Sequence, residues 1–246
     1  MTVLIVSLTL RQLLGQRRTW LLVLLALAPV LLAVTFRFTT DGTRDAREFV
    51  ADGVMRNVMV NLVLALAALI FGTAALGQEF EDGTAPYLFA KPLARWRIAL
   101  AKVLAAWLGT AGVVGVSVIA TGLIALAGGP MDLIIPAFVV AMALGALAYA
   151  SLFVCLSVLF DRALIIGLIY VFIWEALITN LAPGAAYLSV RAYTIGIARA
   201  LADTPASTFS AQLSGPASFA ALALVVVLTS AYATYRLGSL ELARRV

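Results

Sequence analysis

The sequence predicts an all-α polytopic membrane protein with six transmembrane helices. Hydrophobic residues make up 63% of the chain, charged residues only 12%, and the mean hydropathy is +1.07. Soluble domains carry about 25% charged residues. Several apolar runs reach the roughly 20 residues that a helix needs to cross about 30 Å of hydrocarbon. Because these runs are continuous rather than alternating, they exclude a β-barrel.

An interfacial amphipathic helix is the first element expected, over residues 2–18. Val6 and Leu10 follow helical spacing, while Ser7 and Arg11 lie on the opposite face. A helix of this kind lies in the membrane interface rather than crossing it.

Six apolar segments follow, and each predicts one membrane span. They cover about residues 19–36, 57–77, 103–127, 134–160, 163–181 and 217–235. Polar segments separate them, and the longest, 182–216, lies between the last two spans. Within it, residues 185–201 can form a helix, and residues 204–215 are typical of a polar loop.

The distribution of basic residues predicts the orientation. Six spans put both termini on one side of the membrane, together with residues 78–102 and Arg162. The segments on this side carry eleven Lys and Arg, and those on the other side carry six. The positive-inside rule therefore predicts that both termini are cytoplasmic. The same residues explain the pI near 9.7, and they favour membrane lipid over nucleic acid as a partner.

A dense charged strip, residues 78–102, joins the second and third spans. Thr84 is a good helix N-cap, Pro86 suits a first helical turn, and Pro92 disfavours helix at the residue before it. These signals predict a helix of about two turns over residues 85–90. Its apolar centre is formed by Tyr87, Leu88 and Phe89. An apolar centre with a charged rim indicates a docking site for another protein, and an interfacial loop held by lipid head groups is the alternative.

The strip also resembles a known loop. The spacing Glu79-x3-Gly83-Thr84-x3-Leu88-x3-Pro92-x2-Arg95-x6-Lys102 is similar to the first cytoplasmic loop of exporter-type ABC transporter permeases. These permeases share the six-span architecture of the ABC G subfamily, and the small bacterial permeases of nitrous-oxide-reductase maturation are similar members. The resemblance implies that this loop is a coupling helix that contacts the ATP-binding subunit. The contact residues that it implies are Glu79, Thr84, Tyr87, Leu88, Phe89, Pro92 and Arg95.

The resemblance also implies which subunits the chain binds and in which membrane it is located. It implies two copies of an ABC ATP-binding subunit, which would bind ATP and Mg, and a second permease subunit, as a homodimer or with a close paralogue. It also implies that residues 182–216 are an external re-entrant segment. The expected location is the bacterial cytoplasmic (inner) membrane.

The chain itself lacks the groups of an enzyme. It contains no G-x-x-x-x-G-K-[ST] phosphate loop, so ATP hydrolysis is expected on a separate subunit. It has no His, the commonest metal ligand and general base. Its single cysteine, Cys155, cannot form a disulfide within the chain. We therefore expect no catalytic residue, cofactor or metal here. An intramembrane enzyme is disfavoured on the same grounds, and a secondary transporter driven by an ion gradient is the alternative function.

Glu175 is an ionisable residue at membrane depth in the fifth predicted span. A carboxylate there costs a few kcal/mol, so it must face protein or a wet cavity, or be protonated. Three roles remain open from the sequence. It could bond a neighbouring helix or loop, line a cavity as a pathway or gating group, or couple transport to protons.

Overall fold

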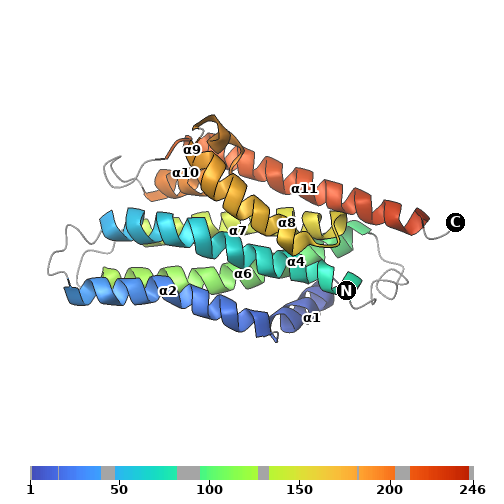
Figure 1. The fold of residues 1–246 in the computed structure, drawn as a ribbon, viewed down its shortest axis with the longest axis horizontal. Coiled ribbons are helices and arrows are strands. Elements are labelled where there is room, and N and C mark those ends of the chain that lie inside the picture. The colour runs from blue at the N-terminus through green and yellow to red at the C-terminus, as the bar shows by residue number, and fades with distance from the viewer. Residues whose placement is uncertain are drawn as a thin grey trace.

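A computed structural model describes residues 2–15, 17–39, 48–81, 95–126, 133–181, 183–202 and 211–243. All regular structure in these ranges is helical (Figure 1), which confirms the all-α class. The elements are α1 (Thr2–Leu14), α2 (Arg17–Thr39), η1 (Phe49–Leu64), α4 (Ala65–Glu81), α6 (Arg95–Ala125), α7 (Ile134–Leu159), α8 (Ala163–Ile169), η2 (Tyr170–Ile178), α9 (Thr179–Leu181), η3 (Pro183–Leu188), α10 (Val190–Ala202) and α11 (Gly215–Ala243). The segments η1 and η2 have the wider π-helical pitch, and η3 is a 3₁₀ turn.

Five helices in the described part of the chain are long and apolar enough to cross a membrane. They are Thr19–Thr39, Phe49–Gly77, Trp96–Ala125, Ile134–Leu159 and Gly215–Gly238. The second joins η1 directly to α4. The fifth span expected from the sequence corresponds to α8, η2 and α9, which form one unbroken helix. Its apolar part, Ala163–Ile178, is shorter than the other five.

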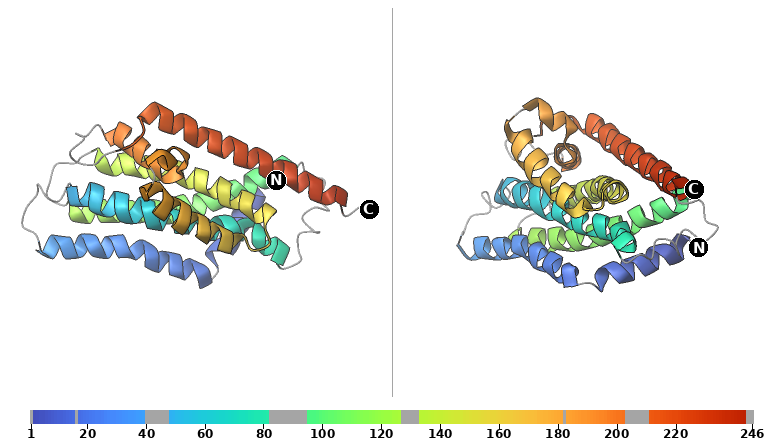
Figure 2. Two further views of the ribbon diagram at one scale, coloured as in Figure 1. Left: turned by 45° about the horizontal axis from the view of Figure 1, so that its top comes forward. Right: turned by 45° about the vertical axis from the view of Figure 1, so that its right-hand side comes forward.

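The long helices lie side by side in one elongated bundle (Figures 1 and 2). Both ends of the chain lie at the same end of the bundle, which we call the terminal end. The short helix α10 lies at the opposite end, which we call the distal end. The two ends therefore differ in what they can present to a partner.

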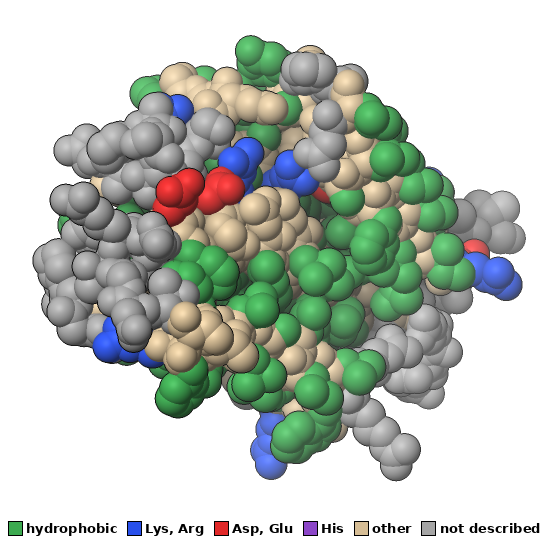
Figure 3. Space-filling model, turned by 60° about the vertical axis from the view of Figure 1, so that its left-hand side comes forward, with side chains coloured by type: hydrophobic (Ala, Val, Ile, Leu, Met, Phe, Trp, Pro, Cys, Tyr) green, Lys and Arg blue, Asp and Glu red, His purple; other side chains and the backbone are tan. Residues whose placement is uncertain are grey.

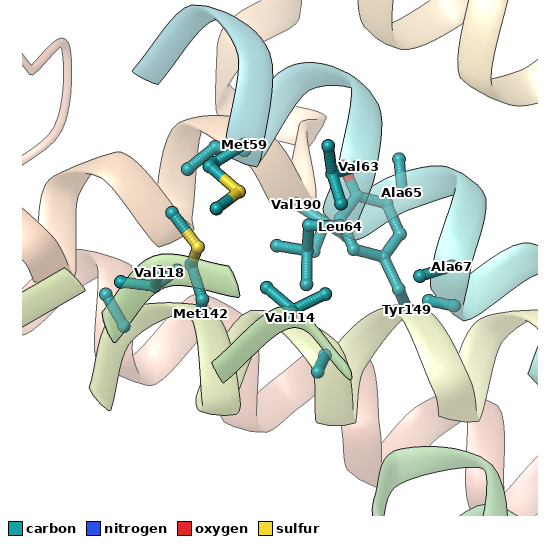
Figure 4. Packing of buried hydrophobic residues seen from close by; sticks show 14 of the residues in the cluster. Met59, Val63, Leu64, Ala65, Ala67, Val114, Val118, Met142, Tyr149 and Val190 are labelled. Atoms are coloured by element: carbon teal, nitrogen blue, oxygen red, sulfur yellow. The ribbon is translucent and has the colours of Figure 1, made fainter. Parts of the chain in front are cut away.

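The joined helix η1–α4 and helix α7 form the centre of the bundle. Within the most apolar 18-residue stretch of Phe49–Gly77, 72% is buried inside the protein, whereas 17% of the corresponding stretch of Gly215–Gly238 is buried. Figure 4 shows the packing at this centre, where Met59 of η1, Met142 of α7 and Val190 of α10 point toward one another. The outer helices α2 and α11 are therefore the least buried of the five long apolar helices.

A close approach between α4 and α7 depends on one glycine. A Cβ atom at Gly72 would lie 2.7 Å from the Cβ atom of Phe153. Real Cβ atoms do not approach that closely, so only glycine fits here without a shift of one helix. Small residues allow the same kind of close packing between helices in membranes generally.

Helix α1 is held against α6 at the terminal end. The Lys102 ammonium group, on a side chain only 2% exposed, donates a hydrogen bond to the Thr9 hydroxyl at 3.1 Å. The Thr19 hydroxyl donates to the Leu13 carbonyl and so joins α1 to the start of α2. Leu13 is also buried, whereas Leu14 beside it is exposed.

Two helices begin before the predicted spans. The second helix begins at Phe49 rather than near Asn57, and α6 begins at Arg95 rather than near Val103. In the first case the charged residues pair inside the helix, since Arg56 donates to Asp52 at 2.7 Å one turn away. Hydropathy predicts where the chain enters lipid, whereas a helix can begin in the polar residues before that point. The observed helices therefore begin earlier than the predicted spans.

Candidate functional site

The fifth helix carries the one acid that the sequence places at membrane depth. Glu175 lies in η2 and is 2% exposed. Its side chain reaches the start of α10, which follows in the chain after the turn η3. The contact joins residues 14 and 15 positions apart, so α10 folds back onto the helix that precedes it.

Three donors surround the Glu175 carboxylate. The Tyr170 hydroxyl donates to Oε1 at 2.9 Å, and the Val190 backbone N–H donates to the same oxygen at 3.0 Å. The Ser189 hydroxyl donates to Oε2 at 2.5 Å. Hydrogen bonds to an ionised acceptor are about twice as strong as neutral ones. Both carboxylate oxygens thus accept hydrogen bonds from donors of their own chain.

The same contacts complete the N-terminus of α10. Ser189 is its N-cap, because its Oγ accepts the Ala192 N–H at 3.2 Å and its carbonyl accepts the Tyr193 N–H. The Val190 N–H is one of the groups that a helix leaves unpaired at this end, and Glu175 satisfies it. A negative charge at a helix N-terminus also interacts favourably with the helix dipole.

Further bonds tie α10 and η3 to the fifth helix. The Arg191 guanidinium donates to the Glu175 backbone carbonyl at 3.1 Å, and the Thr179 hydroxyl donates to the same carbonyl. The Trp174 indole donates to the Leu188 carbonyl at 3.3 Å. Together with the carboxylate bonds, these contacts make one connected polar network, which we call the Glu175 network.

Two further ionisable groups, Arg191 and Tyr149, lie near the Glu175 carboxylate. Burial lowers the pKa of the Arg191 guanidinium, while the Glu175 charge acts to raise it. The hydroxyl of Tyr149, fully buried on α7, is close to the Glu175 carboxylate. Tyr149 thus extends the polar region into the centre of the bundle.

A small pocket adjoins the Glu175 network at the distal end. Figure 3 shows this end, where charged side chains of both signs gather around a hollow. The residues that line the pocket come from η1, α9, η3, α10 and the segment before α11. They are Arg56, Thr179, Ala186, Ser189, Arg191, Ala192, Ile195 and Gln212.

The predicted ATPase-contact residues lie at or beyond the limits of the described structure. Glu79 falls in the last turn of α4, and Arg95 is the first residue of α6. The other five, Thr84, Tyr87, Leu88, Phe89 and Pro92, lie outside the described residues, as does the expected helix over residues 85–90. Their role therefore stays a prediction.

Sequence reasoning missed the partners of Glu175. Tyr170, Ser189 and Arg191 received no role from the sequence, although a Ser directly before a helical pattern is an N-cap signal. That signal could have identified Ser189. No group of three or more His, Cys, Asp or Glu that could hold a metal ion occurs within the described ranges.

Comparison with known families decides the class of the protein. The sequence profile described as "ABC-2 family transporter protein" matches residues 15–177, about two thirds of the chain. The chain belongs to the ABC-2 transporter family. This confirms the predicted class, an ABC transporter permease and a multi-pass membrane protein. No curated protein matches the sequence.

Family membership also bears on partners and on the site. An ABC-2 permease is a transport component, and its family in general implies an ATP-binding partner subunit. The matched segment includes Glu175 near its end, whereas Ser189, Arg191 and the rest of α10 lie beyond it. The Glu175 network therefore joins the part of this ABC-2 permease that matches the family profile to a part that does not.

Proposed function

We propose that this ABC-2 permease is the membrane subunit of an ATP-driven exporter in the bacterial inner membrane. Two ATP-binding subunits dock on its cytoplasmic face, and a second permease subunit, a second copy or a close paralogue, supplies the other half of the pathway. The observation that carries the proposal is the family match over residues 15–177, together with the loop spacing in residues 78–102.

The helix arrangement supports the docking role of this loop. It connects α4, which runs to Glu81, with α6, which begins at Arg95. Both helices belong to the packed bundle, and α6 also holds α1 through Lys102 and Thr9. A force on the loop would therefore reach both central and peripheral helices. Any such coupling requires that the ATP-binding subunit contacts the two transport states differently.

The alternating course of the helices supports a six-span topology. Five helices have spanning length, and the helix formed by α8, η2 and α9 supplies the sixth pass in spite of its shorter apolar part. With six passes, both termini lie on one side, as they do at the terminal end in Figure 1. The excess of Lys and Arg on these segments favours the cytoplasm for that side.

We propose that Glu175 anchors α10 to the fifth helix rather than lining the pathway. The support is its low exposure and its three donors. Both carboxylate oxygens already accept bonds from donors of the same chain, so a cargo group would have to compete with these donors.

Reconstitution tests the main proposal. The permease is co-expressed with a candidate ABC ATP-binding subunit from the same genome, purified as a complex and placed in vesicles. ATP hydrolysis that requires both subunits, and transport that requires hydrolysis, are expected. Transport by the permease alone under an ion gradient, with no ATP, would instead identify a secondary transporter.

A further inference from the structure

The first turn of α6 has an unusual composition for the start of a helix. It begins Arg95-Trp96-Arg97 at the terminal end (Figure 1), and it contains no acid. The first backbone N–H groups of a helix have no partner within it and give this end a partial positive charge, so anions are stabilising here and cations are not. An anion beside this turn would therefore be attracted by the end of the helix as well as by Arg97.

Trp96 and Arg97 form a surface that suits a lipid head group. Both side chains are exposed, Trp96 to 51%, and the guanidinium carbon of Arg97 lies 5.3 Å from the centre of the Trp96 ring. This distance is that of a cation–π contact. A guanidinium stacked on a ring keeps its N–H donors at the edge of its plane, where they match the oxygens of a phosphate. Tryptophan is also enriched at the level of the head groups in membrane proteins.

An exposed apolar row continues from this pair along α6. Leu100, Leu104 and Leu108 follow Trp96 at intervals of four residues, and each is 37–44% exposed. Residues four apart lie on one face of a helix. From Trp96 to Leu108 the helix rises about 18 Å at 1.5 Å per residue. This is slightly more than half of the roughly 30 Å hydrocarbon core, so the acyl chain of a lipid in one leaflet can lie along the row.

We propose that this face of α6 binds a phospholipid with an anionic head group, in the leaflet nearest the terminal end. The phosphate accepts hydrogen bonds from the Arg97 guanidinium beside the Trp96 ring, and one acyl chain lies along Leu100, Leu104 and Leu108. A zwitterionic lipid fits the apolar row equally well, but its head group brings a second cation next to Arg97. The site does not depend on ATP-driven export, since binding needs only the folded chain in its membrane.

Native mass spectrometry of the full chain, purified in a neutral detergent, tests the selectivity of the site. Phosphatidylglycerol and phosphatidylcholine with the same acyl chains are titrated separately. We expect the first phosphatidylglycerol to bind about tenfold more tightly than the first phosphatidylcholine, through a charge-assisted contact that the second lipid makes less well. Equal binding of the two lipids would overturn the proposal.

Variants locate this preference on the protein. Arg97→Gln should remove most of it, and Arg97→Lys should retain part of it, because an ammonium group keeps the charge but not the planar geometry. Arg162→Gln is the matched control, since Arg162 is an exposed arginine at the same end, in the turn between α7 and α8. An unchanged preference in Arg97→Gln, or an equal loss in Arg162→Gln, would mean that the lipid is not selected at this face. Thermal unfolding shows whether each variant keeps the fold.

Fluorescence quenching shows whether the lipid lies against Trp96. The chain is placed in phosphatidylcholine vesicles that contain phosphatidylglycerol, and one of the two lipids carries brominated acyl chains. The difference between the unchanged chain and Trp96→Phe, which keeps an aromatic ring, gives the emission of Trp96. At equal mole fractions of brominated lipid, we expect brominated phosphatidylglycerol to quench Trp96 more strongly. Equal quenching would refute the selection of an anionic head group, and no quenching by either lipid would show that this face contacts protein instead.

Discussion

Replacement of Glu175 should separate an anchoring role from a role in the pathway. In Glu175→Leu, the Tyr170 hydroxyl, the Ser189 hydroxyl and the Val190 N–H all lose their acceptor. A buried donor without a partner costs about 1–3 kcal/mol. Since some of the three donors can reach water or rotate, we expect a total loss of about 3–6 kcal/mol. For a chain of this size that corresponds to a fall in Tm on the order of 10 °C.

Glu175→Gln should be much milder. Its amide oxygen can still accept from Tyr170 and Val190, and its amide nitrogen can donate to the Ser189 oxygen after that hydroxyl turns. The bonds lose their charge assistance, so we expect a loss of about 1–3 kcal/mol. Glu48→Leu is the matched control, since it removes an acid from an exposed position just before η1.

The assay should report on α10 as well as on overall stability. Ile197 on α10 is fully buried, so a cysteine placed there in a cysteine-free background is expected to react with a thiol reagent only when α10 detaches. We expect reaction in Glu175→Leu, little in Glu175→Gln and none in Glu48→Leu. If Glu175→Leu unfolds at the same temperature as the unchanged chain and its α10 cysteine stays protected, the anchoring role is refuted. If instead Glu175→Gln is as stable as the unchanged chain but transports poorly, the carboxylate acts in the pathway.

Three further predictions concern the terminal end and the orientation. Phe89→Asp should prevent the ATP-binding subunit from co-purifying while the permease stays folded, because a charge buried without a partner costs several kcal/mol; an intact complex would exclude Phe89 from the docking surface. An impermeant thiol reagent on intact cells should label a single cysteine at Asp45 but not one at Ala94, because the first position is predicted to be external and the second cytoplasmic. Labelling at Ala94 alone would show that the predicted orientation is reversed. Lys102→Met should lower Tm, because the Thr9 hydroxyl loses its bond to α6, and it should make a fluorophore on α1 more mobile; unchanged anisotropy would show that α1 is held by apolar contacts alone.

The class of the fold could be predicted because it depends on composition and run length. Continuous apolar segments of spanning length leave the backbone only the helix in which to pair its own polar groups. The helix over Ile134–Leu159 matches the predicted span closely, since turn residues bound it on both sides. The start of η1 could not be predicted in this way. Its residues Asp52 and Arg56 are polar in the sequence, but they pair across one helical turn.

The candidate site could be predicted only in part. A glutamate within an apolar run is visible in the sequence, because its cost in lipid demands an explanation. Its partners are not visible, since they depend on how α10 folds back after η3. Ser189 and Val190 lie 14 and 15 residues from Glu175, but the turn η3 lies between them, so helical spacing cannot predict the contact. The choice among the roles that the sequence left open therefore required the geometry.

On the proposed six-span topology, the Glu175 network also explains how the fifth helix tolerates an acid at membrane depth. On insertion scales, a carboxylate at the centre of a spanning helix costs about 2.5–3.5 kcal/mol. Hydrogen bonds to a charged group contribute about 1.5–3 kcal/mol each, so the three donors around Glu175 exceed that cost. Two of the three come from Ser189 and Val190, which the chain adds only after the fifth helix is complete. The stable placement of this helix in the membrane therefore depends on a segment that follows it, and a chain truncated after Leu181 should insert the fifth helix less efficiently than one that extends to Ala202. Equal insertion of the two, measured by glycosylation sites placed at their ends, would show that the apolar residues of α8 and η2 alone suffice.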